Sequence, residues 1–476
     1  MKGSAMTVTA LIAEFNPFHN GHAYYMEKAR SITGADFLAV VMSGNYVQRG
    51  EPAIMDKFLR AEMALACGAD LVLELPVYFS TASAEAFARQ AVCLINELGC
   101  ADYLCFGTEC DDISVLSEFA TVLAKEPPEY KEALQAGLKS GLTYPQARQS
   151  ALLQVLDPAG NVAAYADLLS APNNILGIEY LKALRQTNSP VRPVSICRVG
   201  SGYHDSKLCG SFSSATALRR ALTSPGANTM AYAAVPAAVR CIYQEQYGHT
   251  YPVQAGDFSM LLHSRLLEAG SWEDLAAYAS VSDDLARRIF RRRYDFTDFH
   301  SFAALIKPKN LTESHVRRAL LHILLGLSRD LPEEDAATAG SGVISPSAGS
   351  AAISSAAGSA AAPGMADSAA VSGAADPAAD FSLSRHRYIR ILGLRRSAAP
   401  LLHRIKKEGR LPLISKLADA PSVLSHYEGF TDAKRENALF LLSQEIRCSE
   451  LYGAAAAAKF GVPVSSEYAR RLVILP

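Results

Sequence analysis

The sequence lacks three features that would have placed it in a special class of protein. No stretch approaches the roughly 18 to 20 uninterrupted apolar residues of a membrane-spanning helix, so we expect no membrane span. The N-terminal run MKGSAMTVTALIAEF has no small-residue cleavage pattern, so we expect no signal peptide. Positive charge is not in excess either, because 46 Lys and Arg oppose 47 Asp and Glu. That balance excludes a uniformly basic nucleic-acid-binding protein, but it is compatible with a local basic face.

The cysteines form no recognisable ligand pattern. Nine are present, which is an odd number, and no two form a Cys-x-x-Cys pair. Cys100, Cys105 and Cys110 recur every five residues, which fits no common zinc spacing. We therefore expect no metal site, no disulfide, and a reduced, cytoplasmic compartment.

The length indicates more than one domain. The chain has 476 residues, of which 49% are hydrophobic, so it can form more than one packed core. The clearest boundary is the segment 335–380, which is almost entirely Ala, Ser, Gly and Pro. Such a segment cannot bury enough surface to offset its ordering entropy, so we expect a disordered linker. An Ala-rich helix is the alternative, but Gly and Pro interrupt it repeatedly. The other expected units are 6–226, 227–334 and a helical C-terminal part at 381–476.

Residues 6–110 alternate between short apolar runs and longer helical patterns. The runs at 7–13, 36–42, 71–75 and 103–106 predict strands, and 19–33, 56–67 and 82–98 predict helices. Helices at 112–125 and 128–139, a strand near 194–198 and a helix after Ser213 complete this half. Beyond about Ala227 the strand signals fade. The pattern predicts an α/β fold: a Rossmann-like parallel sheet followed by an α-helical C-terminal region.

Polar residues gather directly after the predicted strands, where open parallel sheets bind their ligands. The first strand is followed by His19-x-Gly21-His22 at the start of a helix. Two imidazoles three residues apart share one side of the first turn, whose free N–H groups and positive dipole favour phosphate. Neutral or charged, both can donate to phosphate oxygens, and Gly21 leaves room for a nucleotide against the backbone. The alternative is a chance pair of histidines in a turn.

A second motif, SSATALR at 213–219, opens a later helix. The hydroxyls of Ser213, Ser214 and Thr216 and the guanidinium of Arg219 suit triphosphate oxygens. An ordinary Ser N-cap followed by a solvated Arg is the alternative. Together, the two motifs resemble the HIGH nucleotidyltransferase superfamily, whose Rossmann-like domains catalyse attack on the α-phosphate of ATP.

Longer segments extend the resemblance to one family. EFNPFHNGH, VMSGNYVQRGEPAIMDKFLRAEMAL, GADLVLELP, FGTE, PNNILG and YIRILG are similar to segments of the tRNA(Met) cytidine acetate ligase family. The similarity covers most of residues 6–330 and resumes near Ser384. There are two departures: MKGSA precedes Met6, which we expect to be the initiator, and the segment 335–380 looks like an insertion.

The resemblance implies an activity. ATP and acetate would form acetyl-adenylate and pyrophosphate, and the acetyl group would pass to N4 of the wobble cytidine of elongator tRNA(Met). ATP, together with Mg²⁺, would be a substrate, with no tightly bound cofactor. Residues 6–226 would then be the ATP-binding catalytic domain, and 227–334 a helical tRNA-facing region.

The resemblance also implies the site residues. His19 and His22 are the candidate catalytic residues, and no metal ligands are expected. The candidate ATP-binding residues are Ile12, Ala13, Glu14, Phe15, Asn16, Pro17, Phe18, His19, Asn20, Gly21, His22, Ala23, Tyr24, Tyr25, Gly107, Asn173 and Arg198. The candidate phosphate-binding residues are Ser213, Ser214, Thr216 and Arg219.

Four further charged residues have two interpretations each. Lys57 and Arg60, one helical turn apart, are either contacts to phosphate or RNA, or part of a solvated helix face. Glu14 and Glu74 follow or end strands at the functional edge, where each would position a ligand or pair with a Lys or Arg. An adenylated acetate needs no acyl-carrying cysteine, which agrees with cysteines in apolar contexts.

Local basic clusters lie beneath the neutral total charge. Residues 285–293 carry five arginines, and 305–318 and 385–410 carry further groups of Lys and Arg. Counterion release favours binding of a tRNA backbone to such clusters, and a solvated helix face is the alternative for each. The candidate tRNA-binding residues are Arg291, Arg292, Arg293, Lys307, Lys309, Arg317 and Arg318.

Two other functions remain open. A small-molecule adenylyltransferase would use the same attack on an α-phosphate, but the long basic helical sequence argues against it. A non-catalytic RNA-binding protein could retain a nucleotide-binding fold, but the intact HNGH argues against that.

Overall fold

A twisted sheet forms the centre of the molecule. The computed structural model describes residues 6–110, 112–156, 162–198, 214–224, 228–330, 386–463 and 465–476. The strand order is β10-β8-β5-β2-β1-β6-β7, and β9 pairs with β8 off this path. The strands are β1 Val8–Ala13, β2 Phe37–Ser43, β5 Leu71–Leu75, β6 Tyr103–Thr108, β7 Arg192–Cys197, β8 Ile389–Arg395, β9 Leu413–Ile414 and β10 Val473–Leu475. The predicted α/β fold is confirmed.

The five strands from β5 to β7 are parallel, as predicted. Alternate residues of β2 enter two different cores, Ala39 and Val41 on one face and Leu38 and Val40 on the other. The order reverses at β1, with β2 on one side and β6 on the other. The carboxyl ends of these two neighbours therefore flank the crevice in which such sheets bind ligands.

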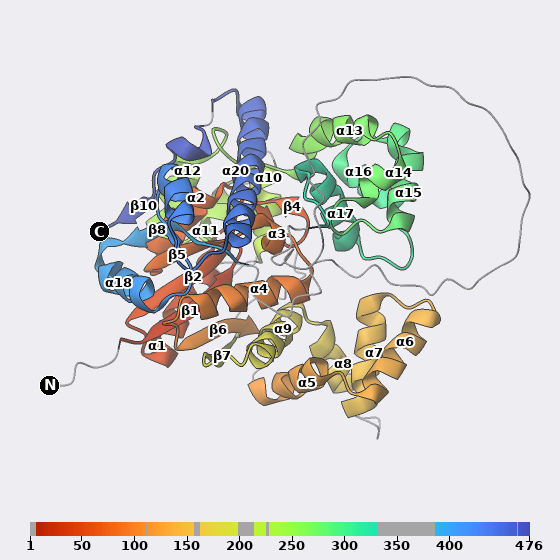
Figure 1. Cartoon of the computed structure of the whole chain (residues 1–476), viewed down its shortest axis with the longest axis horizontal. Helices are drawn as coiled ribbons and strands as arrows, with labels where there is room; N and C mark the ends of the chain where they lie inside the picture. The colour runs from red at the N-terminus through yellow and green to blue at the C-terminus, as the bar shows by residue number, and fades with distance from the viewer. Residues whose placement is uncertain are drawn as a thin grey trace, which may run out of the picture.

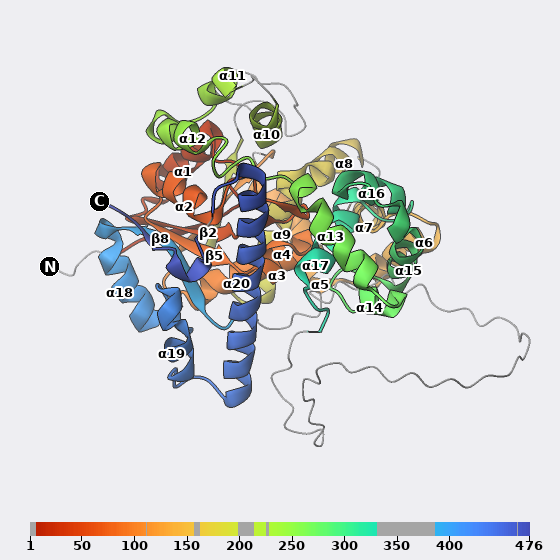
Figure 2. The same ribbon diagram turned by 90° about the horizontal axis from the view of Figure 1, so that it is seen from above.

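Helices cover both faces of the sheet (Figure 2). One face carries α1 Asn20–Thr33, α2 Lys57–Ala66, α10 Ala215–Thr223, α11 Asn228–Ala233 and α12 Arg240–Gln246. The other carries α3 Val77–Ser80, α4 Ala84–Glu97 and α9 Pro172–Gln186, with α5 Ile113–Lys125, α6 Pro128–Lys139, α7 Tyr144–Leu156 and α8 Val162–Ser170 packed beyond them. A short hairpin, β3 Tyr46–Val47 and β4 Glu51–Pro52, follows β2.

From Ser259 onward, the predicted helical region lies beside the sheet (Figure 1), whereas α11 and α12, which also follow residue 227, cover one face of the sheet. The part beside the sheet comprises α13 Ser259–Glu268, α14 Trp272–Ala276, α15 Asp283–Arg292, α16 Phe299–Ile306 and α17 Glu313–Leu325. Gly50, at the tip of the β3–β4 hairpin, lies against the backbone of α17, because a Cβ added to it would collide with Arg318 N. The helical region is therefore fixed to the loop that follows β2.

The C-terminal part contains the predicted helices and also contributes strands to the sheet. Besides α18 Ala399–Glu408, α19 Ala420–Ser425 and the long α20 Asp432–Phe460, this part supplies β8, β9 and β10. β8 joins β5 in antiparallel fashion and extends the sheet. Its sequence IRILGLR was missed because two arginines interrupt the apolar run that marks a buried strand. The predicted linker at 335–380 lies outside the described residues.

Candidate active site

The two histidines cap the N-terminus of α1 and each other. His19 is the N-cap residue, and its Nδ1 accepts a hydrogen bond from Gly21 N at 3.0 Å. His22 Nδ1 accepts from His19 N at 3.3 Å, and the two rings stack with their centroids 3.8 Å apart. Because both Nδ1 atoms are acceptors, the hydrogen-bond network assigns the proton of each neutral ring to Nε2. Each ring therefore offers one N–H donor.

Both imidazoles are neutral at physiological pH. Burial, together with the positive charges of Arg198 and Arg219, lowers the pKa of His19 to about 3. Burial, His19 and Arg198 likewise hold the pKa of His22 well below its ordinary value. The sequence left open whether these groups are neutral or charged, and the structure favours neutral donors.

The rest of the segment between β1 and α1 shapes the loop. Phe15 and Phe18 are fully buried and contact the His22 ring, with centroids 5.0 and 5.6 Å away. Asn16 Oδ1 accepts from Ile54 N at 2.9 Å, and Asn20 Nδ2 donates to Ala233 O at 3.1 Å. These side chains are held by protein partners, so the part of this segment offered to a ligand is chiefly the histidine pair.

Gly21 is required for a reason the sequence did not reveal. A Cβ built on it would lie 2.8 Å from His19 Cε1 and 3.0 Å from His19 Nδ1. The space was predicted to admit a nucleotide. In the structure, the imidazole of His19 occupies the place that a Cβ at residue 21 would need, and the room for a nucleotide stays a prediction.

The carboxyl ends of β6 and β7 form the other wall of the site. Arg198 N donates to Thr108 O at 2.9 Å, and the Arg198 side chain passes over Gly107. The Glu109 carboxylate accepts from Asn173 Nδ2 and, at 3.0 Å, from Asn174 N. The sequence analysis assigned no role to Glu109, although it lies in the FGTE segment. Its position directly after β6, where such sheets bind ligands, could have marked it as a site residue.

The second motif also reaches the histidine loop. Ser214 is the N-cap of α10 and accepts from Ala217 N at 3.1 Å, as the ordinary interpretation predicted. Arg219, however, is only half-exposed, and it donates to Asn16 O at 2.5 Å and to Thr216 Oγ1 at 3.2 Å. Ser213 lies outside the described residues.

Three strand ends and two helix N-termini thus place neutral and cationic donors near one another at one edge of the sheet. A sequence model of the HIGH nucleotidyl transferase family matches residues 6–341. The tRNA(Met) cytidine acetate ligase of Acetivibrio thermocellus is 36% identical over 87% of this chain and 89% of its own, and that of Halothermothrix orenii is 35% identical over 87% of each. The chain belongs to the tRNA(Met) cytidine acetate ligase family.

Two solved structures have the same fold as this chain. Thermotoga maritima TmcAL in its apo form matches 99% of this chain and all of its own, with a TM-score of 0.83 and 26% identity. The same protein bound to α-thio ATP matches equally much, with a TM-score of 0.81 and 27% identity. The family and the fold expected from the sequence are confirmed.

Both interpretations of Lys57 and Arg60 in this ligase-family chain were wrong. Each side chain is completely buried, so neither contacts RNA nor lies on a solvated face. Arg60 donates to the carbonyls of Met55, Glu14 and Ser43 at 3.0, 2.6 and 3.1 Å. Lys57 ion-pairs with Glu74 at 2.6 Å, which confirms the second interpretation of Glu74. Glu14 accepts from Gln48 N at 2.8 Å, and burial raises its pKa.

The predicted tRNA-binding residues differ in their exposure to solvent. Arg291, Lys307 and Lys309 are exposed, and Arg292, also exposed, pairs with Asp295 at 2.7 Å. Arg293 stacks on Phe290 and Tyr294, 3.6 and 4.5 Å from their ring centroids. Arg317 pairs with Glu51 and Glu313, so it anchors α17 to the β3–β4 hairpin, which argues against a contact to RNA.

The chemistry of the cysteines agrees with a reaction that needs no thiol. The eight cysteines among the described residues form no disulfide with one another. Burial raises the pKa of Cys67 and Cys93 to about 11 and that of Cys100 and Cys105 to about 12, which disfavours nucleophilic thiolates.

In the part of the chain that the structure describes, no group of three or more His, Cys, Asp or Glu side chains is arranged to hold a metal ion. None of its helices is long and apolar enough to cross a membrane.

Proposed function

We propose that this chain acetylates N4 of the wobble cytidine of elongator tRNA(Met), using ATP and acetate in the cytoplasm. An acetate oxygen attacks the α-phosphorus of ATP, the bond to the bridging oxygen breaks, and acetyl-adenylate and pyrophosphate form. The cytidine amine then attacks the acetyl carbonyl, AMP leaves, and the amine loses one proton. The observation that carries the proposal is the pair of neutral histidines at the N-terminus of α1, in a chain whose relatives are ligases of this kind.

The site residues suit the first step. The Nε2–H groups of His19 and His22 donate to phosphate oxygens without a charge change, and the dipole of α1 favours the same anion. Arg198 is close enough to both histidines, and Arg219 to His19, to lower their pKa, and the two arginines add positive charge. Gly107 and Asn173, with the segment 12–25, complete the proposed ATP site, and the relative that binds α-thio ATP supports this placement. Mg²⁺ would be held chiefly by the phosphates, since it needs few protein ligands.

The decisive experiment is mass spectrometry of elongator tRNA(Met) after incubation with the protein, ATP and labelled acetate. We expect labelled N4-acetylcytidine at the wobble position. Acetate-independent pyrophosphate exchange would instead indicate an adenylyltransferase for another small molecule. Binding of tRNA with no exchange at all would indicate a non-catalytic RNA-binding protein.

Gly21→Ala should disable the ATP site. The added methyl group displaces the His19 ring from its cap, so we expect acetate-dependent pyrophosphate exchange to fall by about 10²-fold, the typical effect of losing one preorganised donor. Gly256→Ala is the matched control, because nothing lies within 4 Å of its added Cβ and its φ is not positive. Full exchange activity in Gly21→Ala would refute the assigned role of His19.

Charge reversal on α15 should weaken tRNA binding only. Arg291→Glu with Arg292→Glu removes two exposed cations, so we expect the Kd for tRNA to rise at least about tenfold at low salt and its salt dependence to decrease. Pyrophosphate exchange should be unchanged, since it needs no tRNA. The control is Lys416→Glu, whose side chain is 70% exposed. Unaltered tRNA affinity in the double variant would exclude α15 from the tRNA-binding surface.

A further inference from the structure

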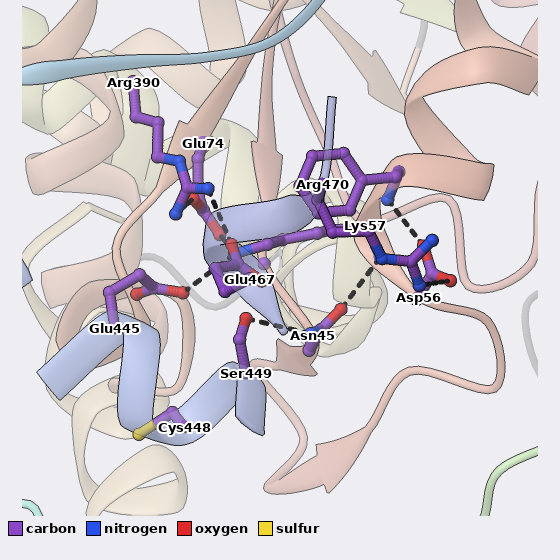
Figure 3. A network of polar contacts seen from close by, with 12 residues as sticks. Asn45, Asp56, Lys57, Glu74, Arg390, Glu445, Cys448, Ser449, Glu467 and Arg470 are labelled. Atoms are coloured by element: carbon purple, nitrogen blue, oxygen red, sulfur yellow. Dashed lines mark hydrogen bonds and ion pairs between the residues drawn. The ribbon is translucent and has the colours of Figure 1, made fainter. Parts of the chain in front are cut away.

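Five ionisable side chains meet in the interior where the C-terminal part joins the sheet. Lys57 comes from α2, Glu74 from β5, Arg390 from β8, and Glu445 from α20 (Figure 3). The fifth is Glu467, on the short helix η7 Glu467–Ala469. All five are buried, with at most 5% of each side chain exposed. We call them the buried charge cluster.

The charges of the buried charge cluster do not cancel if every group is ionised, because three carboxylates face two cations. Lys57 Nζ lies 2.6 Å from Glu74 and 2.7 Å from Glu467, but 3.7 Å from Glu445. Arg390 pairs with Glu74 at 3.2 Å and with Glu467 at 2.6 Å. Glu445 is therefore the carboxyl group of the cluster with the weakest pairing, since its one cation neighbour among these residues, Lys57, lies 3.7 Å away. An extra buried charge is expensive, so this group is the one expected to bind a proton.

The surroundings of Glu445 agree with a neutral acid. Its Oε2 accepts a hydrogen bond from Val77 N at 2.7 Å, and its other oxygen faces Glu74 and Lys57. Burial and the neighbouring Glu74 raise the pKa of Glu445 to about 8, which Lys57 and Val77 N offset only in part. Burial alone would also raise the pKa of Glu467, but Lys57 and Arg390 hold it at about 2. The two carboxyl groups therefore differ in protonation because Glu467 has two cations within 2.7 Å, whereas Glu445 has only Lys57 at 3.7 Å.

The carboxyl groups of Glu74 and Glu445 lie directly against the loop that follows β2. A Cβ built on Gly44 would lie 2.8 Å from Glu74 Oε1 and 3.1 Å from Glu445 Oε1. The next residues are held by α20 as well, because Asn45 Nδ2 donates to Ser449 Oγ at 3.1 Å and Tyr46 OH donates to Cys448 O at 3.0 Å. The loop 43–52 is therefore packed against this face of α20.

The same loop leads to the candidate active site. Gln48 N donates to Glu14 Oε1 at 2.8 Å, and Arg60 donates to Gly44 O and, at 2.6 Å, to Glu14 O. Glu14 directly follows β1 and begins the segment that ends at the histidine pair. A shift of Gly44 away from the carboxyl groups would therefore be transmitted to Glu14.

We propose that Glu445 is a positioning residue for the adenylation reaction: as a neutral acid that keeps its proton and donates a hydrogen bond to Glu74, it keeps Gly44 and the loop 43–52 in the arrangement that the ATP site needs. Ionisation places a second negative charge against Glu74 and displaces the loop. The effect on activity rests on the proposed function, whereas the protonation of Glu445 does not. The charged and titratable groups that face Glu445 are Lys57, Glu74, Arg390 and Glu467, with Tyr46, Tyr388, Arg447 and Cys448.

Glu445→Gln tests the proposal, because an amide reproduces the neutral acid. Folded Glu445 keeps its proton up to about pH 8, whereas the unfolded group releases it near pH 4.5. The wild type therefore loses stability as the pH rises from about 4.5 to about 8, and Glu445→Gln does not. We expect the variant to melt about 2–4 °C higher than wild type at pH 8, with the difference narrowing towards pH 5. Glu436→Gln, an exposed position on α20, should show no such trend.

Activity provides an independent readout. If the protein is active only while Glu445 is neutral, the rate of acetate-dependent pyrophosphate exchange by the wild type should fall between pH 7 and pH 9. We expect this fall to be about tenfold relative to the rate of Glu445→Gln over the same range. Glu74→Gln, which removes the carboxylate held by both cations, should lose activity already at pH 7. The proposal would be overturned if neither the difference in melting temperature nor the ratio of exchange rates between wild type and Glu445→Gln changed with pH. A melting trend without exchange by either protein would overturn the proposed function and leave the protonation of Glu445 standing.

Discussion

His22→Ala should lower acetate-dependent pyrophosphate exchange by about 10²- to 10³-fold, the range observed when one preorganised donor is removed from a site of developing charge. The ring supplies an Nε2–H donor, and its Nδ1 accepts from His19 N and so holds the neighbouring histidine in place. Loss of His22 therefore affects both donors. The measurement is the rate of label exchange between pyrophosphate and ATP at saturating acetate.

Two further variants separate chemistry from folding in this experiment. His22→Asn retains an oxygen that can accept from His19 N but has no group at the position of Nε2, so it should lose the exchange activity with little change in melting temperature. His300→Ala, at an exposed position on α16, should retain full exchange. Wild-type exchange in His22→Asn would contradict donation from Nε2.

Lys57→Met should destabilise the protein by about 3–5 kcal/mol, the usual cost of removing one partner from a buried ion pair. The change leaves Glu74 and Glu467 in the interior with Arg390 as the only remaining cation of the buried charge cluster. We expect the difference in unfolding free energy between wild type and Lys57→Met to diminish towards pH 4, because carboxylates without a cation take up protons in the folded state. Urea-induced unfolding followed across this pH range is the measurement.

The matched control for this effect is Lys416→Met. Lys416 pairs with Asp419 at 3.6 Å, but the two side chains are 70% and 60% exposed, so the change in unfolding free energy should stay below about 1 kcal/mol. Equal destabilisation by the two substitutions would contradict a structural role for the buried charge cluster.

The sequence predicted much of the site because local chemistry marks it. Strands β1, β2, β5 and β6 were predicted within two residues of their observed ends, since each is a short, mainly apolar run. The HxGH segment and Arg219 were identified from residue types that bind phosphate and were found near one another in the structure. The roles of Glu109 and Gly21 were missed, because each depends on a neighbour that the sequence does not show.

By itself, the sequence determined the family, the parallel part of the sheet and the position of the histidines, because apolar periodicity and a strand–turn–helix motif are local properties. Only the tertiary structure decided which charges are buried. Lys57 and Arg390 look like surface cations in the sequence, but contacts between α2, β8 and α20, nearly 400 residues apart, make them the partners of interior carboxylates. The protonation of an acid depends on the solvent and charges around it, and those are set by which distant segments pack together.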